Sequence, residues 1–437
     1  MAAAPKSVTV NGRIYAWPSR PVVVVCIDGS EPAYIEKAVA AGRMPFLAGA
    51  LKTGADLRAD CVVPSFTNPN NISIVTGVPP KVHGIAANYF LDRATGEEVM
   101  MNEPRFLRAG TIFKAFFDAG ARIACVTAKD KLRKLLGHGL DMTSGRAVNF
   151  SSEKSDQATE AENGIARADK FTGLPVPDVY SAELSAFIFA AGVKLLKEFK
   201  PDIMYLSTTD YIQHKYAPGT PVADDFYAMM DGYLQKLDAA GAVLALTADH
   251  GMNAKHDNKG APDVIYLQTV LDDWLGAGAA RVILPITDPY VVHHGALGSF
   301  ATVYLRNITD PYVVHHGALG SFATVYLRNS AARDKLIARL KNLDGILAVY
   351  SGSDGCREFE LPEDRMGDVI VVSGKHKTLG TSVDRHDLTQ LKEPLRSHGG
   401  TTEQRVPLIV TRTLKGMAKG RRFRNFDAFD LALNHAR

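Results

Sequence analysis

Short runs of consecutive apolar residues recur along the chain, and their shared pattern restricts the fold more than any other feature. A strand with one wet face alternates apolar and polar residues, whereas these runs are apolar throughout and rich in β-branched residues. We therefore expect strands covered on both faces, as in a parallel sheet between layers of helices. The runs are PVVVVCIDGS (21–30), RIACVTAKD (122–130), DIMYLSTTD (202–210), AVLALTADH (242–250) and RVPLIVTRT (405–413).

Helical patterns separate these runs. Two long examples are SAELSAFIFAAGVKLLKEF (181–199) and DDFYAMMDGYLQKLDAAG (224–241), and the second ends at Gly241 as a helix C-terminus often does. The alternation of strand and helix predicts an α/β fold, with a doubly wound, mostly parallel sheet and helices on both faces. Near the start, VTVNGRIYAWP (8–18) predicts a hairpin that turns at Asn11-Gly12.

The chain has 437 residues and 46% hydrophobic content, which is enough for a large core that carries an insertion. The alternation stops near residue 259, gives way to short strand-like runs and turns, and returns near residue 395. We therefore expect an α/β core built from residues 1–258 and 395–437, and an inserted α+β cap at 259–394.

A perfect repeat lies within the predicted cap. ITDPYVVHHGALGSFATVYLRN occurs at 286–307 and again, letter for letter, at 308–329. Repeats of solenoid proteins diverge and need about three or more copies, so this pair indicates either a recent duplication of one segment or an error in the assembly of the sequence. We expect one copy to be superfluous to the fold, and the sequence favours neither. The pairs His293-His294 and His315-His316 are interpreted as loop or cap residues rather than metal ligands.

The charge is nearly balanced, with 50 Lys and Arg against 47 Asp and Glu. A formal charge of +3 does not indicate a nucleic-acid or membrane-surface protein. No stretch reaches the roughly 18 apolar residues of a membrane span, and the four cysteines form no C-x-x-C pair. We expect a cytoplasmic protein that binds neither nucleic acid nor membrane, with a homodimer as one possible assembly.

Side chains of the kind that bind metals follow three of the apolar runs. Asp28 follows the first, Asp210 and His214 follow the third, and Asp249 and His250 follow the fourth. Parallel strands end at one edge of such a sheet, where ligands gather. A carboxylate at the end of a buried strand is costly unless it is paired, and Asp and His are among the ligands that zinc takes. The pattern therefore predicts a metal site at this edge.

The segment VVPSFTNPNN (62–71) places the hydroxyl of Thr67 just before Asn68-Pro69. That dipeptide predicts a helix with Asn68 as N-cap and Pro69 at the first helical position. In one interpretation Thr67 only helps to cap this helix. In the other it is a nucleophile, held where free backbone N–H groups receive an anion.

Two lysines, Lys129 and Lys131, follow the second apolar run. Residues two apart in an extended chain share a face, so both side chains can lie at the edge that carries the predicted metal ligands. A solvated group of lysines at the start of a helix is the simpler alternative.

Together these segments resemble the alkaline phosphatase superfamily. The resemblance covers the whole α/β core and rests on CIDG, PSFTNPNNISIVTGVPPKVHGI, STTDYIQH, TADHGM and RSHGGTTEQRVPLIV. It implies two divalent metal ions, which we expect to be Zn²⁺, on either side of a pocket for a phosphoryl group. It also implies that Thr67 is a covalent nucleophile. The implied ligands are Asp28, Thr67, Asp249 and His250 for one ion, and Asp210, His214 and His398 for the other.

His376 competes with His398 for the last of these places. We prefer His398 because the superfamily pattern has a His-Gly pair followed by an acidic residue and a returning core strand. Glu403 and VPLIV supply these after His398, and nothing similar follows His376.

The segments SFTNPNN, NYF and TAKDKL resemble the branch of the superfamily that hydrolyses a small phosphonate. The resemblance implies cleavage of the C–P bond of phosphonoacetate to acetate and phosphate through a phosphothreonine. It further implies that Lys129 and Lys131 bind the substrate carboxylate and that Asn88 binds a phosphonate oxygen. Two alternatives stay open: a phosphodiesterase or phosphomonoesterase of the nucleotide pyrophosphatase type on the same scaffold, and a non-catalytic binding protein.

Overall fold

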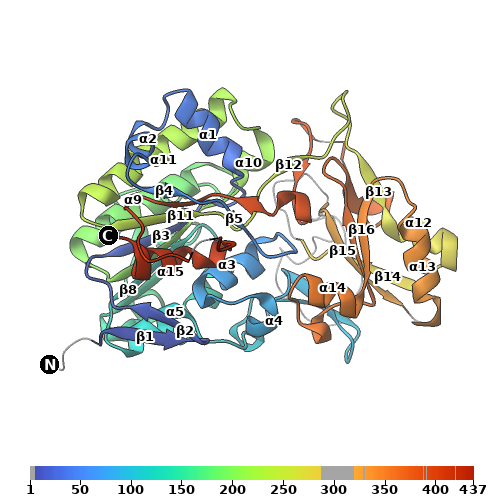
Figure 1. Ribbon diagram of the computed structural model, residues 1–437, viewed down its shortest axis with the longest axis horizontal. Helices are drawn as coiled ribbons and strands as arrows, with labels where there is room; N and C mark the ends of the chain where they lie inside the picture. Colours follow the sequence, from blue (N-terminus) through green and yellow to red (C-terminus); the bar gives the residue numbers. More distant parts are fainter. Residues whose placement is uncertain (1–4, 287–318, 328–329, 387, 390, 419) are drawn as a thin grey trace.

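The structure is a computed structural model that describes residues 5–286, 319–327, 330–386, 388–389, 391–418 and 420–437. Within these residues the chain forms a large central sheet with flanking helices and a second, smaller sheet beside it (Figure 1). No helix in this part of the chain combines the length and the apolar character needed to cross a membrane.

The central sheet has seven strands in the order β4-β21-β11-β3-β10-β8-β9. Five neighbouring strands, from β11 to β9, run parallel to one another, and β21 and β4 are added antiparallel at one side. The predicted doubly wound, mostly parallel sheet is confirmed. The strands are β3 (Val22–Cys26), β4 (Ala55–Asp56), β8 (Ile123–Thr127), β9 (Ala147–Ser151), β10 (Ile203–Ser207), β11 (Val243–Thr247) and β21 (Leu408–Val410).

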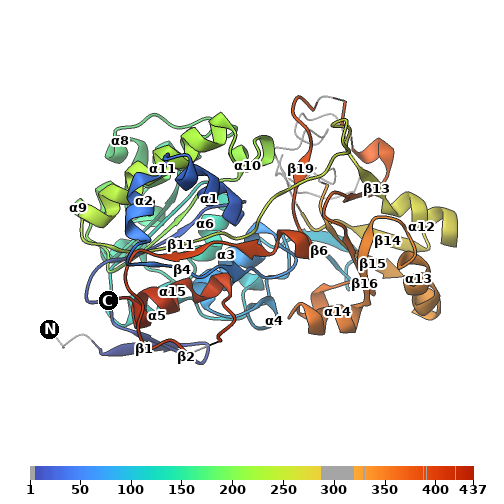
Figure 2. The ribbon, with the colours of Figure 1, turned by 45° about the horizontal axis from the view of Figure 1, so that its top comes forward.

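Helices cover both faces of this sheet, which explains why its strands are apolar without alternation. Val23 and Val25 of β3 face one helical layer, and Val22 and Val24 face the other. Figure 2 shows α1, α2 and α11 over one face and α3, α5 and α15 over the opposite one. The helices around the sheet include α1 (Pro32–Ala40), α2 (Pro45–Ala50), α3 (Thr67–Thr76), α5 (Ile112–Asp118), α9 (Glu183–Glu198), α11 (Pro221–Ala239) and α15 (Ala428–Asp430), the last continued by a π-helix over Leu431–His435.

The predicted hairpin is confirmed as β1 (Ser7–Val10) paired with β2 (Arg13–Ala16). Asn11 and Gly12 both have positive φ, 50° and 77°, as a two-residue turn of this kind requires. Shorter helices complete this half of the molecule: α4 (Pro80–His83), α6 (Asp130–Leu136), α7 (Glu160–Asn163), α8 (Ala168–Thr172) and α10 (Tyr211–Lys215).

The second sheet is antiparallel and has the order β14-β15-β17-β16. It lies beside the central sheet, with α12 (Leu267–Leu275), α13 (Arg333–Leu340) and α14 (Gly352–Glu358) around it (Figure 1). The domain boundaries at 258/259 and 394/395 stay a prediction. The strands are β14 (Ala280–Ile283), β15 (Phe322–Leu327), β16 (Ile346–Ser351) and β17 (Val369–Ser373).

Four further two-stranded sheets join segments that are mostly far apart in sequence. They are β5 (Ala59–Asp60) with β20 (Arg405–Val406), β6 (Tyr89–Asp92) with β7 (Glu97–Met100), β12 (Asn253–Ala254) with β19 (Arg396–Ser397), and β13 (Val264–Tyr266) with β18 (Thr378–Gly380).

The second copy of the repeat supplies β15. This strand lies inside its sheet, because β14 pairs with one edge and β17 with the other. Of the first copy only Ile286 falls within the described residues, and the pairs His293-His294 and His315-His316 lie outside them. One copy of the sequence is therefore enough to supply the strand that this sheet needs.

We predict that deleting residues 287–308, which joins Ile286 to Thr309 and leaves one intact copy, preserves the fold. The closure entropy of a connection depends only weakly on its number of residues. The free energy of unfolding should therefore shift by less than about 1 kcal/mol. Denaturant unfolding followed by circular dichroism measures this shift. Deleting both copies, 286–329, is the control and should abolish folding because it removes an inner strand; a single-copy deletion that is equally damaged would contradict the prediction.

Candidate metal centre

The carboxyl ends of the inner strands are aligned, and this alignment gathers the predicted ligands. Cys26, Ser207 and Thr247 are register partners across β3, β10 and β11. Asp28 and Asp249 come two residues after the ends of β3 and β11, and Asp210 comes three residues after the end of β10. Parallel strands in register thus bring three carboxylates to one edge of the sheet, as the sequence predicted.

Gly29 lets the first of these loops pass close to Asp210. Its φ is +71°, and a Cβ at this position would lie 2.9 Å from the Cβ of Asp210. Any other residue would be strained in its backbone and would clash with a predicted ligand. The glycine of the CIDG segment is therefore required by the packing of the site.

The first cluster contains Asp28, Asp249 and His250, whose potential ligand atoms lie within 4.8 Å of one another. His250 Nε2 lies 3.2 Å from Asp28 Oδ1 and 3.7 Å from Asp249 Oδ2. The backbone N–H groups of Gly29 and His250 donate to Asp249 Oδ1 at 3.2 and 3.0 Å. These bonds leave Asp249 Oδ2 directed at the histidine, on the side where a cation would lie.

The second cluster surrounds Asp210. His214 Nε2 lies 2.9 Å from Asp210 Oδ2, and His398 Nε2 lies 3.9 Å from the same oxygen. The closest grouping of ligand atoms, however, combines Asp210 and His398 with His250 rather than with His214. The rings of His250 and His398 stack at 3.6 Å with an interplanar angle of 6°, so the two clusters are contiguous.

All three histidines are held in the same way. Nδ1 of His214 bonds the carbonyl of Arg396 at 3.0 Å, Nδ1 of His250 bonds that of Gly251 at 2.9 Å, and Nδ1 of His398 bonds that of Ser65 at 2.7 Å. A carbonyl only accepts, so each Nδ1 carries the hydrogen and each neutral ring has its lone pair on Nε2. Hydrogen bonds from the other ring nitrogen to a carbonyl orient histidines that ligate metals.

Burial and charge set the protonation of this group. Burial lowers the pKa of His398 well below its usual value, and the neighbouring His250 and His214 lower it further. Burial alone would raise the pKa of Asp210, but the three imidazoles hold it below the ordinary value. The lowered pKa values keep the His398 imidazole neutral and the Asp210 carboxyl ionised, and these are the forms of the two groups that bind metal ions.

The segment that carries Thr67 is fastened to the His398 loop. Ser65 N donates to Gly399 O at 3.1 Å, Gly399 N donates to Ser65 Oγ at 3.0 Å, and Ser65 Oγ donates to Gly400 O at 2.9 Å. Gly399 has φ +123°, and a Cβ there would meet the ring of Phe66 at 2.5 Å. Thr67 thus begins its helix beside a predicted metal ligand.

The predicted start of this helix is wrong by two residues. Phe66 is the N-cap of α3 and Thr67 its first residue, so Pro69 is the third helical residue and Asn68 is not the cap. Proline is tolerated there because the N–H groups of the first turn have no partner within the helix. The N-cap residue itself makes no side-chain bond to α3, and instead Asn88 Oδ1 accepts from Asn68 N at 3.3 Å. Thr67 is half-buried at the positive end of the helix.

Asn71, one turn after Thr67, was not singled out from the sequence. Its Nδ2 donates to Thr67 O at 3.0 Å and to Asp249 Oδ2 at 3.3 Å, and its Oδ1 accepts from Tyr205 Oη at 2.6 Å. Asn71 therefore joins the Thr67 segment to the first cluster. The i,i+4 spacing from Thr67 was the only signal in the sequence that could have found it.

The predicted substrate-binding residues lie at two places. Asn88 is buried beside the first turn of α3, where it contacts Asn68. Lys129 is the N-cap of α6, and its Nζ lies 3.4 Å from Val179 O and 4.0 Å from Glu153 Oε2. Burial lowers the pKa of Lys129, while the carboxylates of Glu153, Asp210 and Asp28 oppose that shift, which places the lysine in the field of the clusters. Lys131 is half-buried in the first turn of α6.

The residues of the two clusters fit divalent ions. Asp28, Asp210 and Asp249 are at most 7% exposed, and buried carboxylates are costly unless cations or hydrogen-bond donors compensate their charge. His250 Nε2 has no hydrogen-bond partner among the described residues. Oxygen and imidazole nitrogen donors with oriented lone pairs are those that zinc takes. His376, the competitor of His398, is exposed and bonds Ala254 O through Nδ1.

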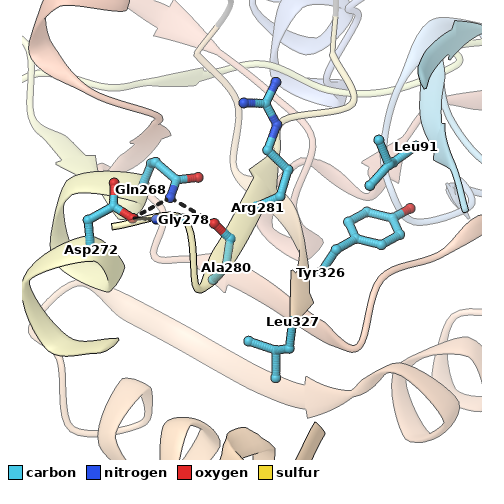
Figure 3. Close-up of a pocket in the computed structure, with 8 residues that line it drawn as sticks. All are labelled: Leu91, Gln268, Asp272, Gly278, Ala280, Arg281, Tyr326 and Leu327. Atoms are coloured by element: carbon cyan, nitrogen blue, oxygen red, sulfur yellow. Dashed lines mark hydrogen bonds between the residues drawn. The ribbon is translucent and has the colours of Figure 1, made fainter. Parts of the chain in front are cut away.

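A separate pocket in the second sheet shares no residue with these clusters (Figure 3). Gln268 Nε2 bridges Asp272 Oδ1 and Ala280 O, each at 3.0 Å, so much of its polar lining is already paired internally. We assign no chemistry to this pocket. It is lined by Leu91, Gln268, Asp272, Gly278, Ala280, Arg281, Tyr326 and Leu327.

Comparisons with known proteins agree with this arrangement. The model of the family "Type I phosphodiesterase / nucleotide pyrophosphatase" matches residues 22–401. Crystal structures of phosphonoacetate hydrolase from Sinorhizobium meliloti 1021, in complex with phosphonoformate and with phosphonoacetate, are 60% and 59% identical to the chain. Each covers 99% of both chains with a TM-score of 0.90.

Two more distant proteins are also similar to the chain. An uncharacterized pyrophosphatase/phosphodiesterase from Schizosaccharomyces pombe is 24% identical over 61% of this chain, and the match spans only 50% of that protein's length. The alkaline phosphatase PafA, 15% identical with a TM-score of 0.62 over 95% of this chain and 96% of its own, shares the fold. The expected alkaline phosphatase-like fold is thereby confirmed.

We predict that zinc stabilises the protein through the clusters. At 100 times its dissociation constant, a ligand that binds only the folded state adds about 2.7 kcal/mol to the free energy of unfolding. Thermal unfolding with EDTA and with added Zn²⁺ should show this difference for the natural sequence. His398→Ala should lose most of it, and the matched change of the exposed histidine, His376→Ala, should keep it. An undiminished zinc effect in His398→Ala would contradict the assignment.

Proposed function

The chain belongs to the type I phosphodiesterase / nucleotide pyrophosphatase family, and on that premise we propose that it hydrolyses phosphonoacetate to acetate and phosphate. The observation that carries the proposal is the similarity, at 60% and 59% identity over 99% of the chain, to phosphonoacetate hydrolase crystallised with phosphonoformate and phosphonoacetate. The substrate class is a small anionic phosphonate, and we place the protein in the cytoplasm.

Two divalent ions are part of this proposal, and we take both to be Zn²⁺. Asp28, Asp249, His250 and the Thr67 oxygen would hold one, and Asp210, His214 and His398 would hold the other. The clusters of carboxylates and oriented imidazoles support these sets. When bound, such a pair of ions supplies Lewis acidity toward phosphoryl oxygens and lowers the pKa of the hydroxyl groups that it ligates.

Thr67 is the nucleophile in the proposed reaction. Its hydroxyl loses its proton to water, and the oxygen attacks phosphorus while the carbon–phosphorus bond breaks on the opposite side. The backbone N–H of Thr67, at the start of α3, and the side-chain NH2 group of Asn88 would face the charge that develops on the phosphoryl oxygens. The half-buried position of Thr67 as the first residue of α3 supports this role.

The two lysines would stabilise the negative charge that forms on the departing carbon. Breaking the C–P bond leaves its electron pair on carbon, and the neighbouring carboxylate can delocalise that pair as an enolate. The ammonium groups of Lys129 and Lys131 would pair with this carboxylate and stabilise the added charge as it forms, which lowers the barrier rather than only tightening binding. Protonation of the carbon then releases acetate.

A second displacement regenerates the enzyme. Water attacks the phosphorus of phosphothreonine, the Thr67 oxygen leaves and takes up a proton, and phosphate is released. The same helix N-terminus and Asn88 serve both half-reactions, because the phosphoryl oxygens occupy the same place in each. Asn71 holds Thr67 and Asp249 in fixed relative positions during both half-reactions, because its side-chain amide donates a hydrogen bond to each.

A phosphodiesterase activity is the second candidate. The family description that matches residues 22–401 favours it. Such a reaction would use the same clusters and Thr67 but would need no cation for a substrate carboxylate, so the two functions differ in their dependence on Lys129.

We predict that Thr67→Ala lowers the rate of phosphate release from phosphonoacetate by more than about 10³-fold, because a covalent nucleophile is lost. The zinc content of this variant, measured by atomic absorption, should fall little, since six other ligands remain. Thr67→Ser keeps a hydroxyl and should retain measurable turnover. Activity near that of the natural sequence in the alanine variant would rule out the phosphothreonine route.

We further predict that Lys129→Ala separates the two candidate functions. Its kcat/KM for phosphonoacetate should fall on the order of 10²-fold, the scale of one lost charge-assisted contact, while that for p-nitrophenyl phosphate stays within a few-fold. Lys134→Ala, which changes an exposed lysine of the same helix, is the matched control. Equal losses on both substrates in Lys129→Ala would remove its assignment to the carboxylate.

A further inference from the structure

An ion pair between Lys255 and Glu403 is completely buried near the metal centre. Lys255 Nζ lies 2.9 Å from Glu403 Oε1, and both side chains have zero exposure. Burial lowers the pKa of Lys255; burial alone would raise that of Glu403, but Lys255 keeps it below its ordinary value. Removing two charges from water is costly, and a fully buried pair is often no more stabilising than apolar residues of the same volume. Its presence here calls for a reason other than stability.

Glu403 connects the loops that carry two of the predicted ligands. Its Oε2 accepts from Gly400 N at 3.0 Å, two residues after His398. Its backbone carbonyl accepts from Gly251 N at 2.7 Å, the residue after His250. Its Oε1 is fully used as well, since it also accepts from Asn253 Nδ2 and Thr402 Oγ1, each at 2.6 Å.

Lys255 extends this connection to the segment that follows β17. Its Nζ donates to Lys375 O at 2.7 Å, and its backbone N–H donates to Leu395 O at 2.8 Å. Leu395 precedes β19, whose Arg396 carbonyl holds Nδ1 of His214. The buried pair thus connects the loops of His250 and His398 to each other. It also connects them to Lys375, which follows β17 of the smaller sheet.

We propose that Lys255 and Glu403 are positioning residues that hold His250 and His398 at the spacing the metal centre requires. The geometry they would preserve is the stacking of those two rings at 3.6 Å. Neither residue belongs to a cluster of potential ligands in the described part of the chain, so both act through the loops. The inference rests on the proposed function in one respect, that metal ions bind at these clusters.

The test compares Lys255→Met, Glu403→Gln and the double variant, all close in size to the natural residues. Each single change leaves one buried charge without its partner and should lower the unfolding temperature of the EDTA-treated protein. The double variant removes both charges and should recover much of that loss. Zinc affinity, measured by competition with a chromophoric chelator, should be about 10- to 100-fold weaker in all three variants than in the natural sequence. This is the scale observed when residues that hold metal ligands in place are changed.

The visible absorption of bound Co²⁺ provides a second readout, because it reports the ligand geometry directly. We expect the double variant to differ from the natural sequence in this spectrum. Leu237→Ala is the control for instability alone: it opens a cavity in the core beneath α11 and should lower the unfolding temperature without weakening zinc binding.

Zinc affinity and a Co²⁺ spectrum equal to those of the natural sequence in the double variant would overturn the inference. So would a loss of zinc affinity in Leu237→Ala as large as that in the double variant. If the natural sequence itself bound no zinc, the proposed metal centre would fail instead, so the two failures are distinguishable.

Discussion

Three carboxylates buried at one sheet edge are the constraint on which the rest of the molecule depends. Asp28, Asp210 and Asp249 each follow a strand of the same parallel sheet, so the register that stabilises the sheet also forces like charges together. Repulsion between buried carboxylates has to be offset by nearby positive charge or hydrogen-bond donors. Carbonyl bonds to three Nδ1 atoms, the Asn71 amide and the start of α3 are all arranged around that requirement.

The parts of this arrangement that the sequence predicted are those that follow from strand periodicity. An unbroken apolar run implies a strand covered on both faces, and parallel strands end together, so the sequence alone places the polar residues that follow several runs near one another. Asp28, Asp210 and Asp249 were found in this way. The roles given to Thr67 and the lysines came from resemblance, because spacing alone favoured the simpler interpretations, helix capping for Thr67 and solvation for the lysines.

Other features depend on contacts between distant segments, which no local pattern records. RVPLIVTRT was expected among the parallel strands, yet β21 is antiparallel because the chain enters the sheet from the opposite end. The start of α3 differed because the Ser65 segment is fixed by Gly399 and Gly400, which sets where the helix can begin. The partnership of Lys255 with Glu403, 148 positions apart, had no signature in sequence at all.

The repeat has a consequence for tolerance to mutation. Its second copy supplies β15, and Ser321 at the start of that strand donates its N–H to the carbonyl of His398 at 2.9 Å. The same letters stand 22 residues upstream. Closure free energy changes by only about 0.6 kcal/mol for each doubling of the number of connecting residues. The chain thus carries twice the sequence of a strand that packs against the loop of His398, so a substitution in one copy leaves an intact copy of that sequence in the chain.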